Sequence, residues 1–132
     1  MRRRARLLAL VAVVTFANLR PALAAEVVQQ KHPNVVTATV RAMGADWFDF
    51  DVTISSPYDT AQRYADAFRV TSRDGTVFGE RKLLHDHADE QPFTRDLRAV
   101  RIPRPIREVV VQASDQRFGY GGKSIELLLP GR

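Results

Sequence analysis

Two histidines separated by one residue are the clearest candidates for chemistry in this sequence. His85 and His87 occupy positions i and i+2, and in an extended chain such side chains project from one face, ~6.6–7 Å apart. Two imidazoles so placed can share a metal ion, with Glu90 as a nearby carboxylate ligand and Asp89 or the distant His32 as alternatives. Imidazole with carboxylate suits zinc or copper. Because only two ligands are certain, two solvated histidines where a strand enters a loop are the favoured interpretation.

An aromatic segment near the C-terminus is the second candidate site. Phe118, Tyr120 and Lys123 stand among three glycines, which predicts a mobile hairpin tip. End loops are the usual recognition surface of β-sandwiches, and aromatic side chains there can stack on sugars or peptides. A structural interpretation has equal support, since the turn needs the positive φ of glycine and Tyr120 can fold back on the sheet.

Two further side chains are assigned structural roles. Arg95 follows Phe93 by two residues and shares its face in a regular strand. An inward arginine needs a carboxylate partner, because an unpaired buried charge is costly. We expect Asp66 to form this ion pair; the functional alternative is an anion-binding arginine. Trp47, at the start of another strand, is expected to cover the core rather than to present a ligand platform.

The sequence lacks the motifs of several common enzyme classes. It contains no G-x-S-x-G motif, no phosphate-binding glycine loop and no cysteine nucleophile. We therefore expect a protein that is not an enzyme and has no cofactor, apart from the zinc or copper ion that the histidines would bind.

Alternating apolar and polar residues indicate the strands that must position these candidates. The clearest is 47–55, where Phe48, Phe50, Val52 and Ile54 face one side. Such half-buried strands are typical of antiparallel sheets with one wet face. The remaining predicted strands are 35–43, 67–71, 77–85, 93–102, 108–113 and 124–129, with a short edge strand at 26–29.

Turn residues separate the predicted strands. Asp74 and Gly75 form a hairpin turn, and Pro103 ends a strand. The segment 59–68 fits a short helix or a loop leading into a strand, and we favour the second. The pattern predicts an all-β fold, a single immunoglobulin-like or fibronectin-III-like antiparallel sandwich of about seven strands, over residues 25–132.

Residues 1–24 have the three regions of a cleavable signal peptide. Arginines at 2, 3, 4 and 6 precede an apolar run at 7–16, and small residues at 22 and 24 allow cleavage after Ala24. The apolar run is too short to span a membrane. Arg3 and Arg4 raise the twin-arginine route, but Ala5 and Arg6 favour general secretion. We expect a periplasmic or secreted protein with no membrane span after cleavage.

The net charge of +5 belongs to this leader. Five of the 20 lysine and arginine residues lie in 1–24, which leaves fifteen basic residues against 15 acidic ones. A neutral domain gives no support for a nucleic-acid partner. The absence of cysteine excludes disulfides and predicts no lipid-anchored N-terminus, so the fold must depend on its core.

Three motifs together resemble a known family. They are 85–95 (HDHADEQPFTR), the alternation of 109–113 ahead of Asp115, and 119–123 (GYGGK). Over residues 47–130 the chain resembles a family of uncharacterised small exported bacterial β-sandwich proteins with an HxHxxEQPFTR segment and a GYGGK hairpin. Asp86 replaces the usual proline, and 96–99 (DLRA) replaces a turn, which alters that loop or lengthens the strand. The resemblance implies export and fold, and no activity.

These observations predict a non-catalytic, exported β-sandwich that acts as an accessory or interaction module in the periplasm. Its end loops would face a protein or glycan of the cell envelope. The alternative is a periplasmic zinc- or copper-binding protein that uses His85 and His87.

Overall fold

The computed structural model describes residue 17 and residues 29–132. The predicted signal peptide, apart from residue 17, lies outside the described residues. So does the predicted edge strand at 26–29, apart from Gln29, which is not in a strand. Among the described residues, no helix has the length and apolar character needed to cross a membrane.

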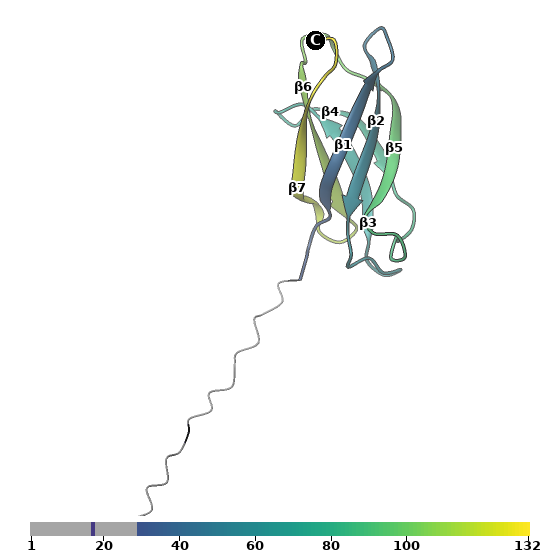
Figure 1. The fold of residues 1–132 in the computed structure, drawn as a ribbon, viewed down its shortest axis with the longest axis vertical. Coiled ribbons are helices and arrows are strands. Elements are labelled where there is room, and N and C mark those ends of the chain that lie inside the picture. Colours follow the sequence, from purple (N-terminus) through teal and green to yellow (C-terminus); the bar gives the residue numbers. More distant parts are fainter. Residues whose placement is uncertain (1–16, 18–28) are drawn as a thin grey trace, which may run out of the picture.

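Seven strands and no helix make up the described chain, so the protein is all-β as predicted (Figure 1). The segment 59–68 is a loop leading into a strand, which confirms the favoured alternative. The strands are β1 (Asn34–Ala42), β2 (Trp47–Ser55), β3 (Ala65–Thr71), β4 (Val77–Lys82), β5 (Phe93–Arg101), β6 (Glu108–Asp115) and β7 (Gly119–Leu128).

The strands form two antiparallel sheets packed face to face. One sheet has the order β1-β2-β5 and the other β4-β3-β6-β7. The β1–β2 turn, the β5–β6 loop and the C-terminus lie at the upper end in Figure 1, and the β6–β7 hairpin lies at the lower end. The two ends of the sandwich therefore carry different sets of loops.

The core lies between the sheets and follows the predicted alternation. On β2, the four predicted inward residues are no more than 3% exposed. The opposite sheet supplies Phe68, Val70, Val109, Val111 and Ala113, all fully buried. Period-2 alternation is preserved because each strand buries one face only.

Several strand boundaries differ from the prediction. β4 ends at Lys82, whose partner is Ala67, and Leu83 N–H still donates to the Asp66 carbonyl at 2.8 Å. Because β3 begins at Ala65, no strand remains for His85 to pair with. His85 and His87 therefore lie in the β4–β5 loop rather than on a strand. β7 begins at Gly119 and contains an irregularity, since Ala113 pairs with Gly121 but Val111 pairs with Ile125.

β5 continues through the segment 96–99, where the sequence left a turn or a longer strand open. A bulge accommodates this, because Phe48 pairs with Val100 and Phe50 with Leu97. Ala99 has a φ of 54°, and its N–H donates to the Asp49 carboxylate at 2.9 Å. An extra residue in one strand of a pair produces this local kink.

The register of β2 predicts unequal costs for neighbouring substitutions. Phe50→Ala should lower the free energy of unfolding by about 3–5 kcal/mol, because it empties a fully buried aromatic site. Asp49→Ala should cost about 1 kcal/mol through the lost hydrogen bond to Ala99. Urea unfolding of both variants measures the difference. Equal costs would contradict the register, since a one-residue slip exchanges the two faces.

Candidate functional site

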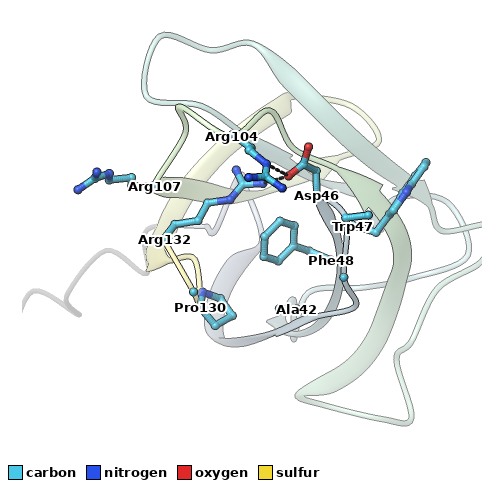
Figure 2. A pocket seen from close by; sticks show the side chains of 11 residues that line it. Ala42, Asp46, Trp47, Phe48, Arg104, Arg107, Pro130 and Arg132 are labelled. Carbon is cyan, nitrogen blue, oxygen red and sulfur yellow. Dashed lines mark hydrogen bonds and ion pairs between the residues drawn. The ribbon is translucent and has the colours of Figure 1, made fainter.

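A cavity of about 440 Å³ opens at the upper end of the sandwich. Its walls come from the β1–β2 turn, the β5–β6 loop and the residues after β7 (Figure 2). The lining residues are Ala42, Gly44, Ala45, Asp46, Trp47, Phe48, Arg104, Arg107, Pro130, Gly131 and Arg132. Three arginines and one carboxylate side chain give it a basic character.

Asp46 joins two of these arginines. Its Oδ1 lies 3.1 Å from Nη2 of Arg132 and 3.3 Å from Nε of Arg104 (Figure 2). Arg132 also donates to backbone carbonyls of the 102–106 segment at 2.5–2.9 Å, and its side chain is only 10% exposed. The side chain of Arg104 is 84% exposed. Arg132 is therefore part of the scaffold, whereas Arg104 can exchange its partner.

The turn that carries Asp46 has an unusual backbone. Ala45 and Asp46 adopt φ values of 47° and 72°, a left-handed region that residues other than glycine rarely occupy. Hydrogen bonds hold the turn, from Met43 N–H to Trp47 O at 2.8 Å and from Ile102 N–H to Asp46 O at 2.9 Å. Conformations of this kind persist only where neighbouring structure enforces them, and they cluster at functional sites.

Trp47 lies at the rim of the cavity, 42% exposed. The expectation that it covers the core is wrong. The next residue, Phe48, takes the inward position and is 3% exposed, so alternation directs Trp47 outward. Figure 2 shows Trp47 and Arg107 on opposite sides of the cavity.

Sequence reasoning missed this site because it counted charge over the whole domain. Arginine recurs at every third position from Arg95 to Arg107, a spacing that fits no strand face. The structure separates their roles, with Arg95 bound to Glu90 and Arg98 bound to Asp96. Of the last three, Arg104 and Arg107 line the cavity, and Arg101 is the cross-strand partner of Trp47 at its rim.

The predicted histidine pair lies at the lower end of the sandwich. The two rings are 4.9 Å apart, and His87 stacks on Phe93 at 3.9 Å. His87 is 6% exposed, and burial lowers its pKa, with smaller contributions from the charges of Arg95 and His85. Nδ1 of His87 is buried and has no hydrogen-bond partner in the described part of the chain. The two rings thus lie close together, and the buried Nδ1 of His87 is available to a ligand.

Glu90 is not gathered with the two histidines. Its carboxylate lies 3.1 Å from Nη2 of Arg95, an interaction that lowers the pKa of Glu90. Within residues 29–132, no group of three or more histidine, aspartate or glutamate side chains is placed to hold a metal ion. The metal site stays a prediction that depends on His85 and His87.

The predicted ion pair between Arg95 and Asp66 is wrong. Arg95 shares the face of Phe93, as expected, but lies on an edge strand and reaches Glu90 across the preceding turn. Asp66 belongs to β3 in the other sheet, and its Oδ1 is buried with no hydrogen-bond partner among the described residues. The sequence did not show that β3, which carries Asp66, and β5, which carries Arg95, belong to different sheets.

The aromatic hairpin folds back on the sandwich instead of projecting. The Tyr120 hydroxyl donates to Glu80 at 2.5 Å, and the Arg69 guanidinium lies 3.7 Å from its ring. Burial, followed by the hydrogen bond to Glu80 and then the charge of Glu80, raises the pKa of Tyr120. Lys123 contributes a backbone N–H to the Asn34 side chain at 2.9 Å. Of the three predicted binding residues, Phe118, at 45%, and Lys123 are exposed, whereas Tyr120 is half-buried.

Two glycines of the GYGGK motif, Gly121 and Gly122, are needed because the segment before β1 packs directly against their backbone. A Cβ on Gly121 would lie 2.6 Å from the His32 ring, and one on Gly122, where φ is +74°, would clash with the Pro33 carbonyl. His32 Nδ1 also lies 3.0 Å from the Gly119 carbonyl. The motif therefore attaches the segment before β1 to the hairpin, and it is not a mobile tip.

The buried carboxylate of Asp115 organises the same end. Asp115 is 1% exposed and accepts N–H bonds from Arg117 and Phe118 at 2.8 and 2.9 Å, and Nε of Arg63 lies 3.1 Å away. Burial acts to raise the pKa of Asp115, but Tyr58, these two N–H groups and Arg63 together hold it below its usual value. The group is thus ionised at neutral pH.

The chain is similar in sequence to a known protein. A protein of Halomicrobium mukohataei, named "Putative lipoprotein", is 36% identical over 95 residues. The match covers 72% of this chain and 46% of that protein, so the chain spans about half the length of its relative. No protein-family model and no solved structure matches the chain.

The Asp115 cluster predicts an acid-sensitive fold. Asp115→Asn should lower the free energy of unfolding by about 3 kcal/mol at pH 7, because it leaves the mostly buried Arg63 without its anion. Since the folded pKa of Asp115 is depressed, its contribution is complete above about pH 4 and is lost as the pH falls through the folded value. Denaturant unfolding between pH 7 and pH 2 should show a shallower acid loss in the variant.

Asp89→Asn is the matched control, since Asp89 is exposed in the β4–β5 loop. It should follow the parent protein at every pH. An Asp115→Asn curve parallel to the parent curve would contradict the assignment.

Proposed function

We propose that this protein is an exported, non-catalytic interaction module that binds a protein or glycan of the cell envelope at the upper cavity. The observation that carries the proposal is that Trp47 and Arg104 are exposed at the rim of a cavity, where a second arginine, the largely buried Arg132, pairs with Asp46. A few positioned polar groups around a concave surface are typical of a binding site.

Export is supported by two independent observations. The sequence of residues 1–24 has the order of regions found in signal peptides. The Halomicrobium relative carries a name that places it among lipoproteins. Both favour the periplasm or the cell exterior as the location of this protein.

The strand order favours the fibronectin-III-like alternative over the immunoglobulin constant type. In constant-type domains the fourth strand joins the sheet of the first two strands. Here β4 pairs with β3, in the sheet that holds β6 and β7. Modules of this architecture commonly bind partners through the loops at one end.

A non-catalytic role agrees with the cavity lining. Among the described residues that line it, none is a serine, threonine, cysteine, lysine or histidine, the side chains that usually act as nucleophile or base. The carboxylate of Asp46 is engaged by Arg104 and Arg132. These groups can bind and orient a partner, which is the role we assign to them.

Substitution of the cavity rim tests the proposal. Trp47→Ala and Arg104→Ala should each reduce retention of envelope protein or glycan on the immobilised protein by about tenfold, the effect of losing one charged or aromatic contact. Arg98→Ala is the matched control, because Arg98 is exposed on β5 and bound to Asp96. Thermal melts verify that each variant is folded.

Equal retention by the parent and by both rim variants would overturn the proposal. If Arg98→Ala reduced retention as much as the rim variants, binding would reflect non-specific charge attraction, and the proposal would likewise be overturned.

A second candidate function is zinc or copper binding by His85 and His87. The observation that favours it is the 4.9 Å ring separation together with the unpartnered Nδ1 of His87. A bound ion would satisfy this buried nitrogen, which otherwise costs free energy. Water or a partner group would supply the remaining ligands.

Thermal melts with zinc, copper(II) or chelator test this second function. At a hundredfold excess over Kd, metal should stabilise the parent by about 2.7 kcal/mol, which corresponds to a rise in Tm of roughly 10 °C. His85→Ala should abolish the rise while leaving the metal-free Tm unchanged, because His85 is exposed. Leu84→Ala, at a neighbouring position that is 84% exposed, is the control. Flat melts would exclude the metal site.

A further inference from the structure

Three exposed arginines follow one another across the upper end of the sandwich. Arg101 ends β5, Arg104 lines the cavity, and Arg107 follows in the β5–β6 loop. Arg107 also lines a second hollow of about 370 Å³, between the β3–β4 turn and residues 105–108. Arg107 thus belongs to the lining of both hollows.

The carboxylates at this end are already engaged by other groups. Glu108 is bound by Arg73 at 3.0 Å, Asp46 by Arg104 and Arg132, and the Asp74 side chain accepts hydrogen bonds from Thr76 at 2.9 and 3.1 Å. Within residues 29–132, neither Arg101 nor Arg107 has an ion-pair partner. Arg101 and Arg107 therefore present guanidinium groups at this end that no carboxylate of the described residues pairs with.

Trp47 adds an aromatic surface beside these charges. It is the direct cross-strand partner of Arg101, so both side chains emerge on the outer face of the three-stranded sheet. The indole is 42% exposed. An exposed aromatic ring next to arginines offers stacking to a sugar ring and forked hydrogen bonds to a carboxylate.

We propose that this surface binds a carboxylated polysaccharide, which lies along Arg101, Arg104 and Arg107 with one sugar ring against Trp47. The inference rests on the proposed function, because it names the ligand of the same site. Cations at intervals along this surface fit a polymer that carries repeated carboxylates. An acidic peptide is disfavoured, since extended peptides add to sheet edges and this end presents loops and side chains.

Arg104 is suited to exchange partners on binding. Its bond to Asp46 is long, at 3.3 Å, and its side chain is 84% exposed. Arg132 keeps its 3.1 Å contact with Asp46 when Arg104 leaves. Pro103 and Pro105 flank Arg104 and restrict its backbone, which reduces the entropy lost on binding.

Fluorescence titration with polygalacturonate oligosaccharides tests the inference. Trp47 is the single tryptophan of the chain, so its emission reports directly on the surface. We expect saturable binding that weakens between about 50 and 500 mM salt, as exposed charges require. Arg101→Ala and Arg107→Ala should each weaken it about tenfold, and Arg98→Ala should not.

Two further probes separate the ligand classes. Methyl-esterified polygalacturonate has the same backbone without charge and should not bind. Poly-L-glutamate, a carboxylated polymer without sugar rings to stack on Trp47, should bind at least tenfold more weakly. Equal binding of either probe, or of the arginine variants, would overturn the inference.

Failure of this inference is distinguishable from failure of the proposed function. Retention of envelope material that depends on Trp47 and Arg104, without polygalacturonate binding, would overturn the polysaccharide and keep the binding module. Loss of both would overturn both.

Discussion

The buried carboxylate of Asp115 is the interaction on which the lower end of the sandwich depends. It closes the β6–β7 hairpin by accepting two backbone N–H groups and pairs with Arg63 from the loop before β3. Arg63 in turn donates to the carbonyls of Gln30 and Lys31 at 2.8 and 2.9 Å, which holds the segment before β1 against the hairpin. The close approach at Gly121 follows from this arrangement. One ionised group thus connects three distant parts of the chain.

The upper end also contains a carboxylate–arginine ion pair, but this pair is exposed to solvent. Asp46 also joins arginines, but the Arg104 side chain is 84% exposed where that of Arg63 is 16% exposed. Solvent screens an exposed pair and makes it worth little for stability, so Arg104 can be replaced as a partner without unfolding. A buried pair cannot be opened cheaply. This contrast is the physical reason for placing structure at the hairpin and binding at the cavity.

The proposed functions draw on separate parts of the molecule. The cavity rim offers Trp47 and exposed arginines to an anionic partner, while His85 and His87 lie at the opposite end. Binding at one end therefore leaves the other accessible. The similarity to a Halomicrobium protein covers about half of that protein's length, so the relative contains additional sequence beyond the matched region.

The sequence by itself determined the strands, because each buries one face and so records a period of two residues, as Phe48 to Ile54 show. It also indicated the loop before β3. It misplaced His85, because the end of an edge strand depends on the length of its neighbour. Only the tertiary structure decided which charges meet, since Arg63 and Asp115 are 52 residues apart and Asp46 and Arg132 are 86 apart. Such pairings leave no local pattern, because they arise from the way the sheets bring loops together.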